Sequence, residues 1–223
     1  MRLELIDGVR LVIIAFLAYI PTTTISGWFT AWVAKKCGDD VPENFGFLTL
    51  DPFAHFSLFG FAFLLVGQLF GNYLTIFKGF PGFGRFIILD PPAHGSKSKA
   101  IVEFFARAVS HFIMLTLAAV LLLKVFGPLF AVYMVPSSLW MQQVGPLLVA
   151  CKDIIVFFLG QNIVLFTIYF LFGIADTICF WFHIPRMFST HYFAVLVVTL
   201  LLLSDIVHLV VNQYMSLLQA ILS

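Results

Sequence analysis

The chain has 223 residues, of which 61% are apolar and only 10% are charged, and its mean hydropathy is +1.05. Soluble domains carry nearer to a quarter charged residues. The composition therefore excludes a water-soluble globule and predicts a single integral membrane domain over residues 1–223. The net charge of +1 comes with no basic run, which excludes nucleic acid as a partner. The three cysteines lie far apart and predict neither a disulfide framework nor a zinc site.

Apolar stretches of about 20 residues, the length that a helix needs to cross a bilayer, recur along the chain. They predict an all-α, multi-pass protein of five to six transmembrane helices. The predicted spans are residues 11–34, 53–77, 105–126, 154–177 and 187–218.

Residues 127–150 are apolar as well, but Pro128, Pro136 and Pro146 interrupt them. In a straight helix facing lipid, these prolines would leave carbonyl groups without a partner. We therefore predict a loop or an interfacial, re-entrant segment here, with a kinked sixth span as the alternative.

Residues 78–104 are the one long polar segment and predict a loop between the second and third spans. With five spans, this loop shares a side with the N-terminus. That side then holds about eight basic residues and the other side four, so the positive-inside rule predicts a cytoplasmic, or equivalent, N-terminus. The eight are Arg2, Arg10, Lys78, Arg85, Lys97, Lys99, Arg107 and Arg186, and the four are Lys35, Lys36, Lys124 and Lys152.

Ionisable residues inside a span are costly and point to function by default. Asp176 ends the fourth span, where it is either an interfacial helix end or an inward-facing metal or proton site on the helix that carries Asn162. Asp205 and His208 are three residues apart on one helix face, which predicts a mutually neutralising pair more strongly than a proton relay. Ser110 and His111 begin the third span, where His111 can bond a neighbouring helix.

The stretch "LTLDPFAHFSLFGF", residues 48–61, places an acid, a proline and a histidine at the mouth of an apolar run. The simplest interpretation is a helix start, with Asp51 as the capping residue and Pro52 in the first turn.

The same stretch also resembles the segment after the catalytic helix in site-2-protease-type intramembrane metalloproteases. Those enzymes show a Gly-Asp pair followed by a run like R-L-T-L-N-P-L-A-H-I-D-P-x-G. The pair is matched by Gly38 and Asp39. The run is matched by Leu48, Thr49, Leu50, Pro52, Ala54, His55 and Gly60, with Asp51 in place of Asn.

Further along, the order of the family's motifs is similar. Asp90-Pro91 resembles its N-P loop element, and "FFARAVSHF" resembles its A-x-A-G-P-x-S-N helix start, with Ser110 in register and His111 in place of Asn. Asp176 falls where the family has its third zinc ligand. The resemblance covers roughly residues 10–180 and implies a site-2-protease-like membrane core.

The departure from the family lies in its H-E-x-x-H motif. Ser26 and Thr30 stand at the positions of its two histidines, and Gly27 stands at the position of its glutamate. Neutral hydroxyls are poor zinc ligands, and a glycine cannot take a proton from a metal-bound water. The resemblance therefore implies no catalytic residue and no cofactor, with Asp176 as a vestigial ligand position.

We accordingly expect a non-catalytic binding, regulatory or structural subunit that contacts membrane lipid and other membrane proteins or transmembrane helices. One alternative is an active zinc protease with ligands relocated to His55, His111 and Asp176. Another is an ion- or proton-conducting protein that uses Asp176, Asp205 and His208.

Overall fold

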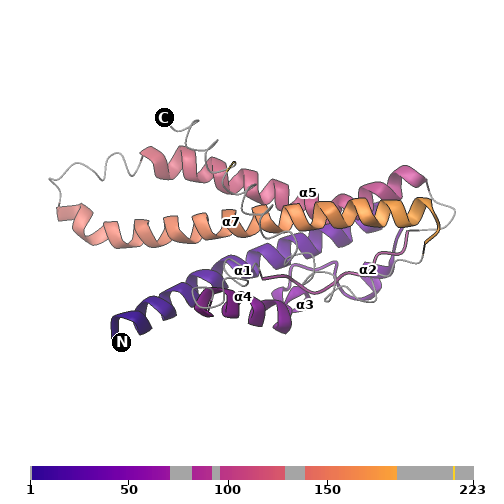
Figure 1. Cartoon of the computed structure of the whole chain (residues 1–223). Helices are drawn as coiled ribbons and strands as arrows, with labels where there is room; N and C mark the ends of the chain where they lie inside the picture. Colours follow the sequence, from indigo (N-terminus) through magenta and orange to yellow (C-terminus); the bar gives the residue numbers. More distant parts are fainter. Residues whose placement is uncertain (1, 71–81, 92–95, 129–138, 185–212, 214–223) are drawn as a thin grey trace.

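The computed structural model describes residues 2–70, 82–91, 96–128, 139–184 and 213, and within these ranges every regular element is a helix. Figure 1 shows three long helices lying side by side, with shorter elements along one of them. In chain order the elements are α1 (Arg2–Cys37), α2 (Val41–Asn44), α3 (Pro52–His55), α4 (Leu58–Phe70), α5 (Lys97–Leu121), the π-helix η2 (Leu122–Phe126) and α7 (Leu139–Trp181).

Three helices are long and apolar enough to cross a membrane: Gly8–Cys37, Lys97–Phe126 and Gly145–Trp181. At 1.5 Å per residue, even 30 residues extend about 45 Å, more than the roughly 30 Å of a hydrocarbon core. The predicted spans 11–34, 105–126 and 154–177 lie within these helices. The predicted span 53–77 contains α4, whose 13 residues are too few to cross alone, and residues 71–77 lie outside the described residues. The predicted span 187–218 lies outside the described residues apart from Gln213.

The segment 127–150 differs from its prediction. Residues 139–150 are the first turns of α7 and continue directly into the predicted fourth span. The loop prediction is therefore wrong for these residues, and they do not form a separate sixth span. Pro146 is the eighth residue of α7, and there it removes a single backbone hydrogen bond. Residues 129–138, with Pro136, lie outside the described residues.

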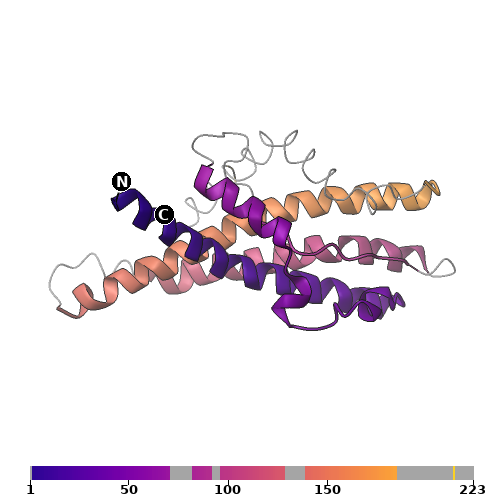
Figure 2. The same cartoon turned by 90° about the horizontal axis from the view of Figure 1, so that it is seen from below.

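The long helices pack in alternating directions. α5 and α7 form an antiparallel pair, in which Ala118 and Ala119 let Leu159 and Ile163 approach closely. α1 lies across both and runs parallel to α7, as Figures 1 and 2 show from two sides.

After α1 the chain turns and returns along the same helix. Phe47 packs against Ala31, and further along Leu64 packs against Ala15 and Tyr19. Residues 47–70 therefore run antiparallel to α1 as an interrupted segment. Residues 47–51 are not helical, and α3 and α4 follow, separated by Phe56 and Ser57.

Residues 82–91 then run back the other way in extended form. Gly82 lies against Tyr19, Ile87 packs with Ala31, and the backbone N–H of Asp90 donates to Asp39. Ten extended residues cover about 33 Å, close to the 30 Å of the twenty helical residues beside them. Of this segment, Gly82, Phe83, Gly84, Ile87 and Pro91 are buried.

This geometry corrects the prediction of one surface loop over residues 78–104, because residues 82–91 run along α1 and α5 begins at Lys97. Lys97 lies over the ring of Trp181, at the end of the bundle opposite to Arg10. The second half of the predicted loop is thus not on the side of the N-terminus, and the eight-to-four count of basic residues no longer supports the orientation that we predicted from it.

Candidate functional site: the buried polar face of α1

The candidate site lies on the face of α1 that meets α3, α5, α7 and the extended segment 82–91. Ser26 and Thr30 are both about 1% exposed on this face. The hydroxyl of Ser26 donates to the carbonyl of Thr23 at 3.3 Å, and that of Thr30 donates to the carbonyl of Ser26 at 2.7 Å. Both hydroxyl protons are thus bonded within α1, a common arrangement for Ser and Thr inside a helix.

Gly27 on α1 lies directly against His55 at the end of α3. A Cβ atom added at this position would lie 2.1 Å from Nδ1 of His55 and 2.9 Å from two further atoms of the ring. Because real Cβ atoms do not approach other heavy atoms so closely, no other residue fits at position 27 while the ring keeps its place. The imidazole of His55 therefore occupies the space into which a glutamate side chain at this position would have to project.

The His55 ring is fixed by its own loop. Its Nε2 lies 2.7 Å from the carbonyl oxygen of Thr49, and because a carbonyl only accepts, Nε2 carries the proton and Nδ1 carries the lone pair. Nδ1 is buried and has no hydrogen-bond partner among the described residues. The ring of Phe47 lies 5.8 Å away, between centroids.

Local capping positions this histidine. The Oδ1 atom of Asp51 accepts the N–H of Phe53 at 3.0 Å, and Pro52 is the first residue of α3. The interpretation of Asp51-Pro52 as a helix start is confirmed. A four-residue helix turns the chain so that His55, at its end, faces Gly27, and the carbonyl of His55 accepts the N–H of Arg85 at 2.8 Å.

Gly38 and Asp39 close the far end of this face. Gly38 has φ = 101° and ends α1 in a Schellman motif, in which Gly38 N–H donates to Lys35 and Asp39 N–H donates to Ala34. The buried carboxylate of Asp39 accepts the N–H of Val41 at 2.9 Å and that of Asp90 at 2.6 Å. Asp39 thus ties the end of the extended segment to the end of α1.

Gly60 makes a second close approach. A Cβ atom here would lie 1.8 Å from the carbonyl oxygen of Phe83. That oxygen also accepts the hydroxyl of Tyr19 at 3.0 Å. Gly60 therefore lets α4 lie directly against the backbone of the extended segment.

One turn before Ser26, a buried network joins three helices. Nδ1 of His111 donates to Oδ1 of Asn162 at 2.8 Å, and Nδ2 of Asn162 donates to the hydroxyl of Thr22 at 3.3 Å and to the carbonyl of Phe158 at 2.8 Å. The contact expected between His111 and a neighbouring helix is present. Ser110 instead donates to the carbonyl of Arg107 on its own helix.

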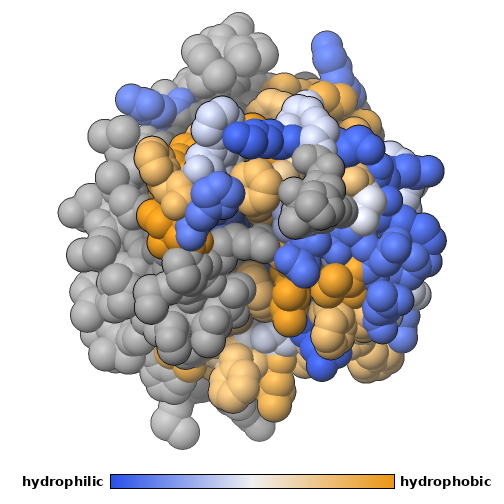
Figure 3. Space-filling view, turned by 90° about the vertical axis from the view of Figure 1, so that its right-hand side faces the viewer, coloured by the Kyte–Doolittle hydropathy of each residue, from blue (hydrophilic) through white to orange (hydrophobic). Residues whose placement is uncertain are grey.

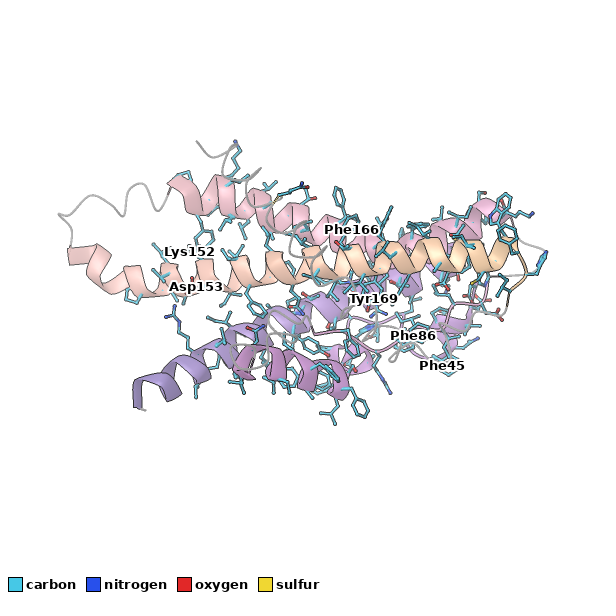
Figure 4. All side chains as sticks on the ribbon, in the orientation of Figure 1. Phe45, Phe86, Lys152, Asp153, Phe166 and Tyr169 are labelled. Carbon is cyan, nitrogen blue, oxygen red and sulfur yellow. The ribbon has the colours of Figure 1, made fainter. Side chains whose placement is uncertain are left out.

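Tyr169 joins this network to a buried cation. The His111 ring stacks on the Tyr169 ring at 5.3 Å, and the guanidinium carbon of Arg107 lies 4.5 Å from the centre of the same ring. Arg107 is 7% exposed and donates to the carbonyl of Arg85 at 3.1 Å. This arrangement combines a cation–π contact with a backbone hydrogen bond, and Figure 4 shows Tyr169 on α7 in the middle of the bundle.

The other sequence-predicted residues lie apart from this centre. Asp176 is half-buried near the end of α7. Among the described residues no three His, Cys, Asp or Glu side chains come close enough to hold a metal ion. Asp205 and His208 lie outside the described residues.

Sequence reasoning missed the part that Gly82, Gly84 and Arg107 have in this site. A Cβ at Gly84 would lie 3.1 Å from the His55 carbonyl oxygen and 3.2 Å from the Arg107 guanidinium. The signal in the sequence is the spacing "GFG" before an apolar run, which suits a backbone that other chain segments approach closely.

Comparison of the chain with protein-family models, curated proteins and solved structures found no match.

Proposed function

We propose that this chain is a multi-pass membrane protein with a site-2-protease-like core that has lost catalysis and acts as a binding or structural subunit of a membrane assembly. The observation that carries this proposal is the contact between Gly27 and His55. Gly27 stands where the family has its general base, and the buried imidazole fills the space that this base would need.

The spatial order of the resembling motifs supports the same proposal. The Gly38-Asp39 pair binds Asp90, the start of the second N-P-like motif, and the Asp51–His55 stretch packs on the helix face that carries Ser26 and Thr30. Among the described residues no three His, Cys, Asp or Glu side chains come close enough to hold a metal ion, and this weighs against the relocated ligands of the protease alternative. We keep that alternative as an outcome of the experiment below.

The membrane placement that we propose follows from the charged residues. One ion pair, Arg10–Asp153, joins α1 and α7 near one end of the bundle, and another, Lys35–Glu43, lies near the other end. The 25 residues from Arg10 to Lys35 extend about 37 Å along α1, so both pairs fit the headgroup layers of one bilayer. Figure 3 looks onto the end with Lys35, where hydrophilic surface gathers.

With this placement, the interrupted segment 47–70 and the extended segment 82–91 both lie at membrane depth. Non-helical backbone is tolerated there only where protein or water covers it. Side chains of the core supply part of this cover: Tyr19 donates to Phe83, Arg107 to Arg85 and Gln161 to Gly82. We count the interrupted segment as a further crossing beyond the three long helices.

Exposed apolar side chains from the end of α2 to the first turn of α4 form the surface that we assign to a partner. Five large apolar side chains there are between 60% and 83% exposed: Phe45, Leu50, Phe53, Leu58 and Phe59. Large, rigid aromatic side chains are typical anchors of protein contacts, so we assign the partner, another transmembrane helix or subunit, to this side.

The experiment is purification in mild detergent, with zinc per chain and co-purifying proteins measured by mass spectrometry on the same sample. We expect no bound zinc and a stoichiometric companion. Phe53→Ser and Phe59→Ser should remove the companion. Leu117→Ser on α5, at a position that is also largely exposed, should retain it.

Zinc near one equivalent per chain that is lost in Asp176→Ala would contradict the proposal and support the protease alternative. The absence of any stoichiometric companion would leave the loss of catalysis standing but contradict the assignment as a subunit.

A further inference from the structure

A groove of about 350 Å³ lies between the first half of α1 and α7. Among the described residues, its lining has two charged side chains, Arg10 and Asp153, and four apolar ones, Leu11, Ile14, Val156 and Phe157. This volume is at the low end for small-molecule sites and suits one hydrocarbon chain rather than a whole lipid. No part of the polar face around Gly27 contributes to it.

The charged residues form the mouth of the groove. Nη2 of Arg10 lies 2.5 Å from Oδ2 of Asp153, and the two side chains remain 52% and 32% exposed. Figure 4 shows Asp153 on α7 above the N-terminal half of α1. Both charges therefore stay accessible to a ligand that carries the two opposite charges.

The apolar residues lie deeper in the same direction. Because α1 and α7 run parallel, Ile14 lies one turn beyond Arg10 and Phe157 one turn beyond Asp153, each about 6 Å further toward the middle of the bundle. The groove thus leads from a pair of opposite charges to an apolar wall along a single axis. A phospholipid has the same order, with a charged headgroup at the bilayer surface and its chains directed inward.

We propose that this groove binds a zwitterionic glycerophospholipid with a primary amine, phosphatidylethanolamine. Arg10 binds the phosphate, Asp153 binds the ammonium group, and one acyl chain lies along Ile14 and Phe157.

The headgroup follows from the chemistry of the two charges. A carboxylate accepts hydrogen bonds from the N–H groups of an ammonium ion, whereas the choline nitrogen has none to offer. An anionic headgroup without an amine would pair with Arg10 but would meet repulsion from Asp153. The site therefore selects ethanolamine over both choline and glycerol headgroups.

The test is reconstitution of the delipidated full chain with equal amounts of phosphatidylethanolamine, phosphatidylcholine and phosphatidylglycerol, followed by mass spectrometry of the lipids that stay bound. A hydrogen bond to a charged group raises the binding affinity about tenfold. We therefore expect wild type to retain phosphatidylethanolamine roughly tenfold over phosphatidylcholine. Asp153→Asn should abolish this preference, and Arg10→Gln should lower retention of all three lipids.

Two further variants separate the groove from general effects of charge. Val156→Trp fills the apolar part from a position that is 38% exposed, while both charges remain, and it should reduce the retained phosphatidylethanolamine. Lys35→Gln and Glu43→Gln remove the matched ion pair at the other end of the bundle and should change nothing.

Equal retention of the three lipids by wild type, which indicates annular lipid only, would overturn the proposal. So would an unchanged preference in Asp153→Asn, or an equal loss in Glu43→Gln. If Arg10→Gln does not fold, the near-isosteric Asp153→Asn still decides the question.

Discussion

Two layers of polar residues lie on the same face of α1, and they differ in what their hydroxyl groups bind. Tyr19 and Thr22 reach other segments, because the Tyr19 hydroxyl lies 3.0 Å from the carbonyls of both Ser57 and Phe83, and Thr22 accepts from Asn162. Two turns later, Ser26 and Thr30 donate only to carbonyls of α1 itself. The first layer, here called the connecting layer, hydrogen-bonds α1 to its neighbouring segments. The second, here called the packed layer, is covered by the His55 ring that lies against Gly27. Burial of a polar residue therefore does not reveal a reactive site, since residues in both layers are buried to a similar degree.

The largest effect is expected where the connecting layer meets a rigid backbone. Gly60→Ala would force a Cβ into the carbonyl of Phe83 and should lower the free energy of unfolding by more than about 3 kcal/mol, measured by thermal unfolding in detergent. Gly160→Ala is the matched control, because a Cβ at Gly160 meets nothing within 4 Å, and it should be neutral or stabilising by up to about 1 kcal/mol.

A smaller loss of stability is expected when the network of Thr22, Asn162 and His111 loses its central residue. Asn162→Ala leaves the Nδ1–H of His111 without its acceptor in a fully buried place, which should cost about 2 to 3 kcal/mol. Thr167→Ala on the same helix removes only a bond to the carbonyl of Ile163 and should cost far less. Equal losses in these two variants would show that the network does not join the helices.

The smallest effects are expected in the packed layer. Ser26→Ala and Thr30→Val remove hydroxyls that bond only within α1 and should each change the free energy of unfolding by less than about 1 kcal/mol. A loss of several kcal/mol in either variant, seen in the same unfolding assay, would mean that these hydroxyls contact something beyond α1.

Part of the helical architecture could be predicted from the sequence, because a long apolar run favours a helix that crosses the membrane. The run 53–77 is the exception, since Phe56 and Ser57 interrupt its helix. The predicted spans 11–34, 105–126 and 154–177 all lie inside long helices. The start at Asp51-Pro52 was also predictable, since capping depends on adjacent residues alone.

The extended segment 82–91 could not be predicted in the same way. Its glycines suggest a turn-rich loop, and their reason appears only when Tyr19 and His55 are seen to lie against them. Residues 139–150 differ from their prediction for another reason: α7 continues through Pro146, because a proline near the start of a helix removes only one backbone hydrogen bond. At the candidate site, the sequence shows that Gly27 cannot act as a base, but only the structure shows that the His55 ring fills the space beside it.

The most direct test of the central claim is a double-mutant cycle between Gly27 and His55. Gly27→Ala should cost more than about 2 kcal/mol in wild type, because the ring is held by Thr49, and less than about 1 kcal/mol in a His55→Ala background, where the ring is gone. The unfolding free energies of the four proteins measure this difference. An equal cost of Gly27→Ala in both backgrounds would contradict the claim that the His55 ring fills the space beside Gly27.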